Sequence, residues 1–222
     1  MRAPRSSRRM LVVEGYSDKR FFQGLQRHIG LAGSFDVIYP GDLSKHPGKV
    51  GAHRTFKLLL EEAAEPGRFD SIGICVDADF EPDGGFSETD GDLKNLLCDA
   101  EFRMTDADRR VYQHKTSGCK ASFWIAPSHA ADGYLESLAL RSLADDESVY
   151  LAEHVLPYVA SLNLPRFDAR NSDRAKLYVY LAIQRKPDKS LLTLMDDGKV
   201  DRAKHDIVQL KNWLLNLFGN RE

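Results

Sequence analysis

The sequence predicts an α/β protein, in which a mostly parallel sheet is flanked by helices and followed by a helical C-terminal extension. Two observations predict this class. Short apolar or β-branched runs alternate with segments of helical spacing over the first half of the chain, which is typical of βαβ units. From about residue 131 the apolar residues recur three and four apart, which indicates helices. We therefore expect an α/β domain over residues 10–130 and a helical region packed on it over residues 131–222.

The first elements are predicted to be a strand, a tight turn and a helix. Residues 10–13, MLVV, form an apolar run that ends at the dipeptide EG, and Gly15 would let the chain turn. After Ser17, a candidate N-cap, apolar side chains recur every fourth residue. The segment FDVIYPGD, residues 35–42, predicts a second strand, and residues 52–65 predict a second helix.

The alternation continues through the middle of the chain. Residues 71–79, SIGICVDAD, predict a strand that ends in acid, and residues 92–104 predict a helix. A charged stretch then leads to a predicted strand at residues 122–127, SFWIAP. Four further segments have helical spacing: DGYLESLAL, ESVYLAEHVLPYV, SDRAKLYVYLAIQ and HDIVQLKNWLLNLF.

Charge is distributed unevenly along the chain. The formal net charge is −2, but residues 77–92 contain seven acidic side chains and no lysine or arginine, so the remainder carries +5. Such a segment repels phosphate unless cations neutralise it, which favours a metal site, a disordered segment or an exposed loop. The three cysteines are far apart without a CxxC pair, which favours buried reduced thiols over a zinc ribbon or a disulfide framework.

The start of the chain, MRAPRSSRRM, is basic and precedes only a few apolar residues. That run is too short for the core of a signal peptide or for a membrane span. We therefore expect a cytoplasmic protein with no membrane partner.

Carboxylates follow two of the predicted strands. Glu14 comes directly after the first strand, and Asp77 and Asp79 end a later one, where side chains two apart share a face if the strand persists through both. Ligands of open α/β sheets bind beyond the carboxyl ends of the parallel strands, so these side chains can converge, with Asp18 from the following helix as a fourth. Clustered carboxylates raise one another's pKa values, and a divalent cation such as Mg²⁺ removes that conflict.

A calcium-binding loop is the rival interpretation of the acidic segment. DADFEPDGGFSE has acids at positions one, three, five, seven and twelve of the calcium-loop pattern. It has Pro82 at position six, where the pattern requires glycine, and a strand rather than a helix precedes it. We therefore prefer the magnesium interpretation.

The two acidic motifs resemble a known family. VVEGYSDKRFF followed by ICVDAD is similar to the TOPRIM domain of topoisomerases, primases and certain nucleases, whose signature is a glutamate after the first strand and DxD after a later one. The acid four residues after the glutamate, Asp18, is similar to the nuclease branch, which includes overcoming-lysogenization-defect nucleases and small stand-alone TOPRIM proteins. The resemblance implies a TOPRIM-like, Rossmann-like fold.

Two later segments, DGYLES and SDRAKLYVYLA, resemble a family of small TOPRIM-like proteins of unassigned function. This resemblance implies that Glu136 is a further metal ligand and that Lys176 is a cation near the scissile phosphate. A glutamate on a helix face and a lysine that reaches to solvent are the alternatives.

The resemblance implies a nuclease that hydrolyses phosphodiester bonds of DNA or RNA with Mg²⁺ or Mn²⁺, in phage defence or DNA processing. Metal would be held by Asp77 and Asp79 and by Glu14 with Asp18, while Glu14 is alternatively a general acid or base. The chain has no GxxxxGK[ST] motif, so an ATPase partner would be a separate protein. The alternative function is a non-catalytic module that binds a phosphate ligand or regulates a partner.

Nucleic acid would also need cations beside the acidic centre. Two basic clusters are candidates for phosphate contacts, although a solvated charged face is the alternative for each. The first contains Arg103, Arg109, Arg110, Lys115 and Lys120, and the second contains Arg166, Arg170, Arg174 and Lys176.

Overall fold

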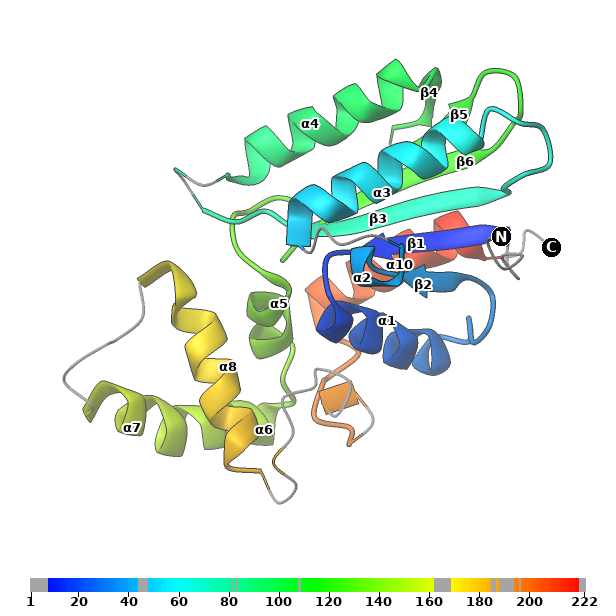
Figure 1. Cartoon of the computed structure of the whole chain (residues 1–222). Helices are drawn as coiled ribbons and strands as arrows, with labels where there is room; N and C mark the ends of the chain where they lie inside the picture. Colours follow the sequence, from blue (N-terminus) through cyan, green and yellow to red (C-terminus); the bar gives the residue numbers. More distant parts are fainter. Residues whose placement is uncertain are drawn as a thin grey trace.

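A six-stranded mixed sheet organises the chain, with the strand order β2-β1-β3-β6-β5-β4 (Figure 1). In this computed structural model, β2, β1, β3 and β6 are parallel, β5 is antiparallel to β6, and β4 is antiparallel to β5. The strands are β1 (Arg9–Val13), β2 (Asp36–Ile38), β3 (Ser71–Asp77), β4 (Phe102–Asp106), β5 (Val111–His114) and β6 (Lys120–Ala126). The structure describes residues 8–43, 48–80, 82, 84–107, 109–161, 169–184, 187, 194–195 and 197–219.

Helices cover both faces of the sheet (Figure 1). On one face lie α3 (Gly48–Glu62) and α4 (Phe86–Asp99), and on the other lie α1 (Tyr16–His28) and α10 (His205–Phe218). Every residue of β3 is buried, because a parallel strand covered on both faces has no solvent side. The predicted α/β class, a sheet flanked by helices, is confirmed.

A group of helices gathers at the edge where β1, β3 and β6 end (Figure 1). It begins with α5, which follows the loop after β6 and packs against α8. Its members are α5 (Leu135–Arg141), α6 (Asp145–Tyr150), the π-helix η1 (Leu151–Val155), α7 (Leu156–Ser161), the 3-10 helix η2 (Ala169–Asn171) and α8 (Ser172–Ala182). These helices therefore face the part of the sheet to which the carboxylates were assigned.

The segment between the third helix and the last strand differs from the prediction. Residues 105–120, taken as a charged connection, contain β5 and part of β4, which form a hairpin at the sheet edge. The alternation was missed because three consecutive residues of β4, from Arg103 to Thr105, are exposed. Polar edge strands lack the apolar pattern that identifies buried ones.

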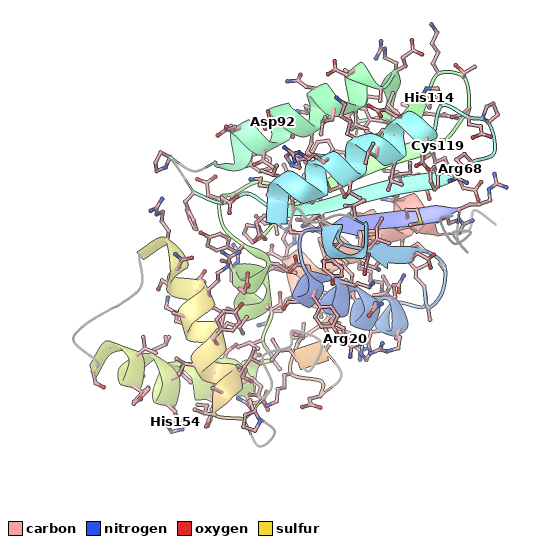
Figure 2. The ribbon with its side chains drawn as sticks, in the orientation of Figure 1. Arg20, Arg68, Asp92, His114, Cys119 and His154 are labelled. Carbon is pink, nitrogen blue, oxygen red and sulfur yellow. The ribbon has the colours of Figure 1, made fainter. Side chains whose placement is uncertain are left out.

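Helix boundaries also differ from the prediction. The helix expected over residues 92–104 is α4, and it begins at Phe86, so the last three acids of the acidic segment lie on a helix and not in a loop. Asp92 is exposed on α4, in the layer over the sheet (Figure 2). The second helix, α3, begins at Gly48 and ends at Glu62, a few residues earlier than expected. The short helix α2 (Pro40–Leu43) follows β2.

The N-terminus of α1 is capped differently from the prediction. Gly15, and not Ser17, is the N-cap residue, and the Asp18 side chain accepts a hydrogen bond from the Gly15 N–H. Gly15 has extended backbone angles, φ −141° and ψ 174°, so the turn does not require a glycine. None of the described helices is long and apolar enough to cross a membrane.

Candidate functional site

Two adjacent parallel strands bring the first carboxylates together. Glu14 directly follows β1, and Asp77 is the last residue of β3. The Asp77 N–H donates a hydrogen bond to Glu14 Oε1 at 2.7 Å, across 63 residues of chain. The strand ends therefore place two carboxylates side by side at the carboxyl edge of the sheet, as the sequence predicted.

Asp18 joins this pair from the first turn of α1. Its Oδ2 lies 2.9 Å from the Gly15 N–H, so the side chain folds back over the start of the helix. Its charge interacts with those of Glu14, Asp77 and Glu136. Asp18 is thus both the capping side chain of α1 and a member of the acidic cluster.

Glu136 enters the cluster from the first turn of α5. The residue is 8% exposed, and its Oε1 accepts a hydrogen bond from the Tyr178 hydroxyl at 3.4 Å. The preceding residue, Leu135, donates its backbone N–H to Asp77 Oδ1 at 2.8 Å. This hydrogen bond connects the start of α5 to the end of β3.

Arg174 of α8 is the cation of this cluster. Its Nη2 lies 2.8 Å from Asp77 Oδ2, and its Nε lies 3.4 Å from Glu136 Oε2. The guanidinium also stacks on the Tyr134 ring, 3.7 Å from the ring centroid. About a third of the Arg174 side chain, 34%, remains exposed, so the cation is reachable from solvent.

Burial and mutual repulsion raise the pKa values of these carboxyls. Burial, with the charges of Asp18 and Asp79, raises the pKa of Glu14 to about 8. Burial and the charge of Glu136 raise the pKa of Asp18 to about 7. Burial and the charges of Glu14 and Asp18 raise the pKa of Asp77 well above its ordinary value. One arginine therefore does not neutralise the cluster.

Asp79 belongs to a neighbouring ion pair. Nζ of Lys49, in the first turn of α3, lies 2.9 Å from Asp79 Oδ2 and 2.8 Å from Thr89 Oγ1. It also donates to the Ala78 carbonyl oxygen at 3.1 Å. The three acceptors hold the lysine beside the acidic cluster. Its positive charge offsets a small part of the rise in the pKa of Glu14.

The backbone turns sharply between Asp77 and Asp79. The strand ends at Asp77, and Asp79 has φ 65° and pairs with Gly133 through two backbone hydrogen bonds. Gly84, with φ 153°, packs so closely that a Cβ there would lie 3.1 Å from the Ala78 carbonyl oxygen. The shared face expected for the two aspartates is not observed, because the strand does not persist through Asp79.

The donor set fits a hard divalent cation in kind and in charge. Five carboxylates share two cations, Arg174 and Lys49, and carboxylate oxygen is the ligand that Mg²⁺ and Mn²⁺ prefer. Both oxygens of Asp77 already accept hydrogen bonds, from Leu135 and Arg174. Within the described ranges, no three His, Cys, Asp or Glu side chains are arranged to hold a metal. A cation bound at Asp77 would have to replace Arg174, and the neighbouring carboxylates would have to move toward it.

Comparison with known families identifies the family of the chain. Residues 8–219 match the family model described as "Protein of unknown function (DUF3226)". This chain belongs to the DUF3226 family. No curated protein and no solved structure matches the chain.

Several of the other predicted cations of this DUF3226 protein have partners outside the carboxylate cluster. Lys176 pairs with Asp173 on α8, 3.4 Å apart. It does not follow Arg174 to the carboxylates, because residues two apart on a helix point in different directions. Arg103 donates to the carbonyl oxygens of Cys98 and Phe102, and Arg109 pairs with Asp106 at 3.5 Å. Arg166 lies outside the described residues.

Sequence reasoning missed Lys49 and Tyr134 in this DUF3226 protein. Lys49 lies 30 residues before Asp79, at the start of α3. That segment belongs to neither acidic motif, so no pattern connected it with the site. Tyr134 belongs to DGYLES, but only the position of α8 shows that its ring supports Arg174. Arg174 itself was among the predicted phosphate-binding residues, although its contact with Asp77 was not foreseen.

Proposed function

We propose that this protein is a TOPRIM-like, Mg²⁺- or Mn²⁺-dependent nuclease that hydrolyses phosphodiester bonds in DNA or RNA. The observation that carries the proposal is the convergence of Glu14, Asp18, Asp77 and Glu136 at one edge of the sheet. These side chains come from β1, α1, β3 and α5. The motifs VEGYSD and VDAD, which resemble TOPRIM, supply three of the four.

A divalent cation would bind at Asp77, with Glu14, Asp18 and Glu136 as further oxygen donors. Once bound, it would polarise a phosphate and lower the pKa of a bound water. Positive charge at this place would also remove the repulsion that raises the carboxyl pKa values.

The protein's own groups would bind the substrate and move protons. Arg174, whose side chain is about a third exposed, would leave Asp77 and contact a non-bridging phosphate oxygen. Glu14 uses Oε1 to accept the Asp77 N–H, so Oε2 would carry its proton. In the alternative role, in which Glu14 is not a metal donor, burial keeps its pKa raised, and Glu14 would give that proton to the departing oxygen near neutral pH.

A cleavage assay tests the proposal. Purified protein is incubated with end-labelled single- and double-stranded DNA and RNA, in Mg²⁺, in Mn²⁺ and in EDTA. We expect metal-dependent cleavage that Asp77→Asn and Glu14→Gln reduce by at least about a hundred-fold, since each removes a group at the reacting centre. Lys176→Gln, on the surface of α8, is the matched control and should cleave like wild type. Cleavage that persists in Asp77→Asn would refute the assignment of the site.

The second candidate function is a non-catalytic TOPRIM-like module that binds a phosphate ligand or regulates a partner protein. One observation favours it: both carboxylate oxygens of Asp77 already accept hydrogen bonds, from Leu135 and Arg174, and are not open to a metal. Titration calorimetry separates the two functions, because the non-catalytic module would bind phosphate ligands or nucleic acid while taking up no divalent cation.

A further inference from the structure

A cavity of about 370 Å³ opens beside β6, between the turn that joins β4 to β5 and helix α10. Along this part of the chain β5 pairs with β6 at Ala121 and Lys120, and the cavity lies beyond that short ladder. Phe123 and Trp124 line the cavity from that edge, and Trp213 lines it from α10. None of the acidic residues of the candidate site lines it.

Two buried donors in its wall have no hydrogen-bond partner. His129, which is 7% exposed, accepts the Ile125 N–H at Nδ1 over 2.9 Å. The proton of the neutral ring therefore lies on Nε2. His129 Nε2 and Trp124 Nε1 are both buried, and neither has a partner within the described residues. A buried donor without a partner is unfavourable, so both donors favour a ligand that carries acceptor atoms.

The neutral state of His129 has a physical cause. Burial, together with the positive charges of Arg110 and Lys94, lowers the pKa of His129 to about 3. By contrast, the second tryptophan is satisfied, since Trp213 Nε1 donates to Ser122 Oγ at 2.8 Å. The unpaired donors thus belong to one part of the cavity wall, His129 and Trp124.

The mouth of the cavity is polar and positively charged. Arg110 lines it and forms no ion pair within the described part of the chain, whereas Arg109 pairs with Asp106. Three exposed amides of α10 complete the rim, on one face of the helix because they are spaced three and four apart. They are Gln209, Asn212 and Asn216.

We propose that this cavity binds a nucleotide, with the base against Trp124 and Trp213 and the phosphate at Arg110. Indole rings stack on any nucleobase, amide side chains donate to and accept from base edges, and a guanidinium binds phosphate. Nε2 of His129 and Nε1 of Trp124 are both covered without a ligand, so an acceptor atom on the base would reach either only after that ring rotates toward the cavity, which for His129 would give up the bond to the Ile125 N–H. A bare anion would leave the aromatic walls unused, and an aliphatic ligand would leave the donors unpaired. The proposal goes beyond the nuclease proposal and does not depend on it.

Intrinsic fluorescence tests the proposal directly, because the chain has two tryptophans and both line the cavity. The full chain is titrated in EDTA with the four nucleoside monophosphates, ribose 5-phosphate and inorganic phosphate, and calorimetry measures stoichiometry. We expect a saturable fluorescence change with at least one nucleotide, with one bound per chain, and none with phosphate or ribose 5-phosphate. A short single-stranded oligonucleotide that binds more tightly than the monophosphate would identify a strand terminus, rather than a free nucleotide, as the source of the ligand.

Two variants connect the binding to this cavity. Arg110→Gln should weaken nucleotide binding by about ten-fold or more, because it removes a charged phosphate contact. Asn212→Ala changes an exposed position of α10, so it should fold normally and weaken binding several-fold. Lys57→Gln, exposed on α3 on the other face of the sheet, is the control and should bind like wild type. No saturable change with any nucleotide, or equal affinity in wild type, Arg110→Gln and Asn212→Ala, would overturn the proposal.

Discussion

Arg174 Nη2 lies 2.8 Å from Asp77 Oδ2, so the guanidinium of α8 forms an ion pair with the carboxylate at the end of the central strand β3. Asp77 is 9% exposed and has acidic neighbours from the end of β1, from α1 and from α5. Losing this partner would leave the buried charge without compensation. This contact therefore connects the stability of the helical region with the chemistry of the carboxylates.

Replacement of Arg174 by glutamine should lower the free energy of unfolding. We expect a loss of about 1–2 kcal/mol near neutral pH without metal, less than for a fully buried ion pair because a third of the arginine is exposed. Urea denaturation measures it. Lys176→Gln, which breaks a surface pair on the same helix, should change the stability by less than about 0.5 kcal/mol. Equal losses in the two variants would contradict the role given to Arg174.

The metal-free protein should lose stability as the pH rises. Folding raises the pKa of Glu14 from 4.5 to about 8 and that of Asp18 from 3.8 to about 7. Between the unfolded and folded values the native state binds more protons, so this contribution is full at low pH and is lost as the pH rises to about 8. Thermal unfolding between about pH 5 and 9 in EDTA measures it.

The same pKa shifts predict how metal should act on stability. Mg²⁺ or Mn²⁺ competes with the bound protons, so either ion should raise the melting temperature more at pH 8 than at pH 6. Glu14→Gln removes one titrating group and should flatten the pH dependence in EDTA. A melting temperature that rises with pH in both proteins would rule out the raised pKa values.

Replacement of Lys49 by glutamine should impair cleavage more than folding. Lys49 positions Asp79 and Thr89, and losing its charge removes three charge-assisted hydrogen bonds at a partly exposed site, at a cost of about 1–2 kcal/mol. A protein that is still folded should cleave about ten-fold more slowly or worse. Lys57→Gln, exposed two turns further along α3, provides the comparison for both stability and rate. Wild-type cleavage by Lys49→Gln would exclude Lys49 from the site.

A glycine pair tests the backbone that carries Asp79. Gly84→Ala should cost about 1–3 kcal/mol, because a Cβ at φ 153° would lie 3.1 Å from the Ala78 carbonyl oxygen. Gly91→Ala, inside α4 with nothing within 4 Å of its Cβ, should instead add about 0.5–1 kcal/mol. Chemical denaturation of both variants measures the difference, and the opposite ranking would contradict the described loop.

The buried strands could be predicted from the sequence, and the polar edge strands could not. β1 and β3 were recognised because strands covered on both faces are continuously apolar, and α10 was found with its observed bounds from its spacing. The β4–β5 hairpin was missed because its outer residues are polar. Glu88 and Asp90 were not recognised as helical, because the only buried residue between them is the polar Thr89, which does not extend the apolar spacing that begins at Leu93.

The candidate site was predictable only where the strand order determines it. Adjacent parallel strands bring Glu14 and Asp77 to one edge, and motif spacing adds Asp18. The partners Lys49 and Arg174 depend on how α3 and α8 pack, which local patterns do not encode. Asp79 turns away from Asp77 because of its positive φ, and no residue pattern in VDAD indicates that turn.

A crystal structure of the protein soaked with Mn²⁺ and measured at the manganese edge tests the central claim most directly. We predict an anomalous peak in contact with the carboxylates of Asp77 and Glu14, with the Arg174 guanidinium displaced from Asp77 Oδ2. A fully soaked crystal without such a peak, in which Arg174 still lies at hydrogen-bond distance from Asp77, would contradict the assignment of a metal centre.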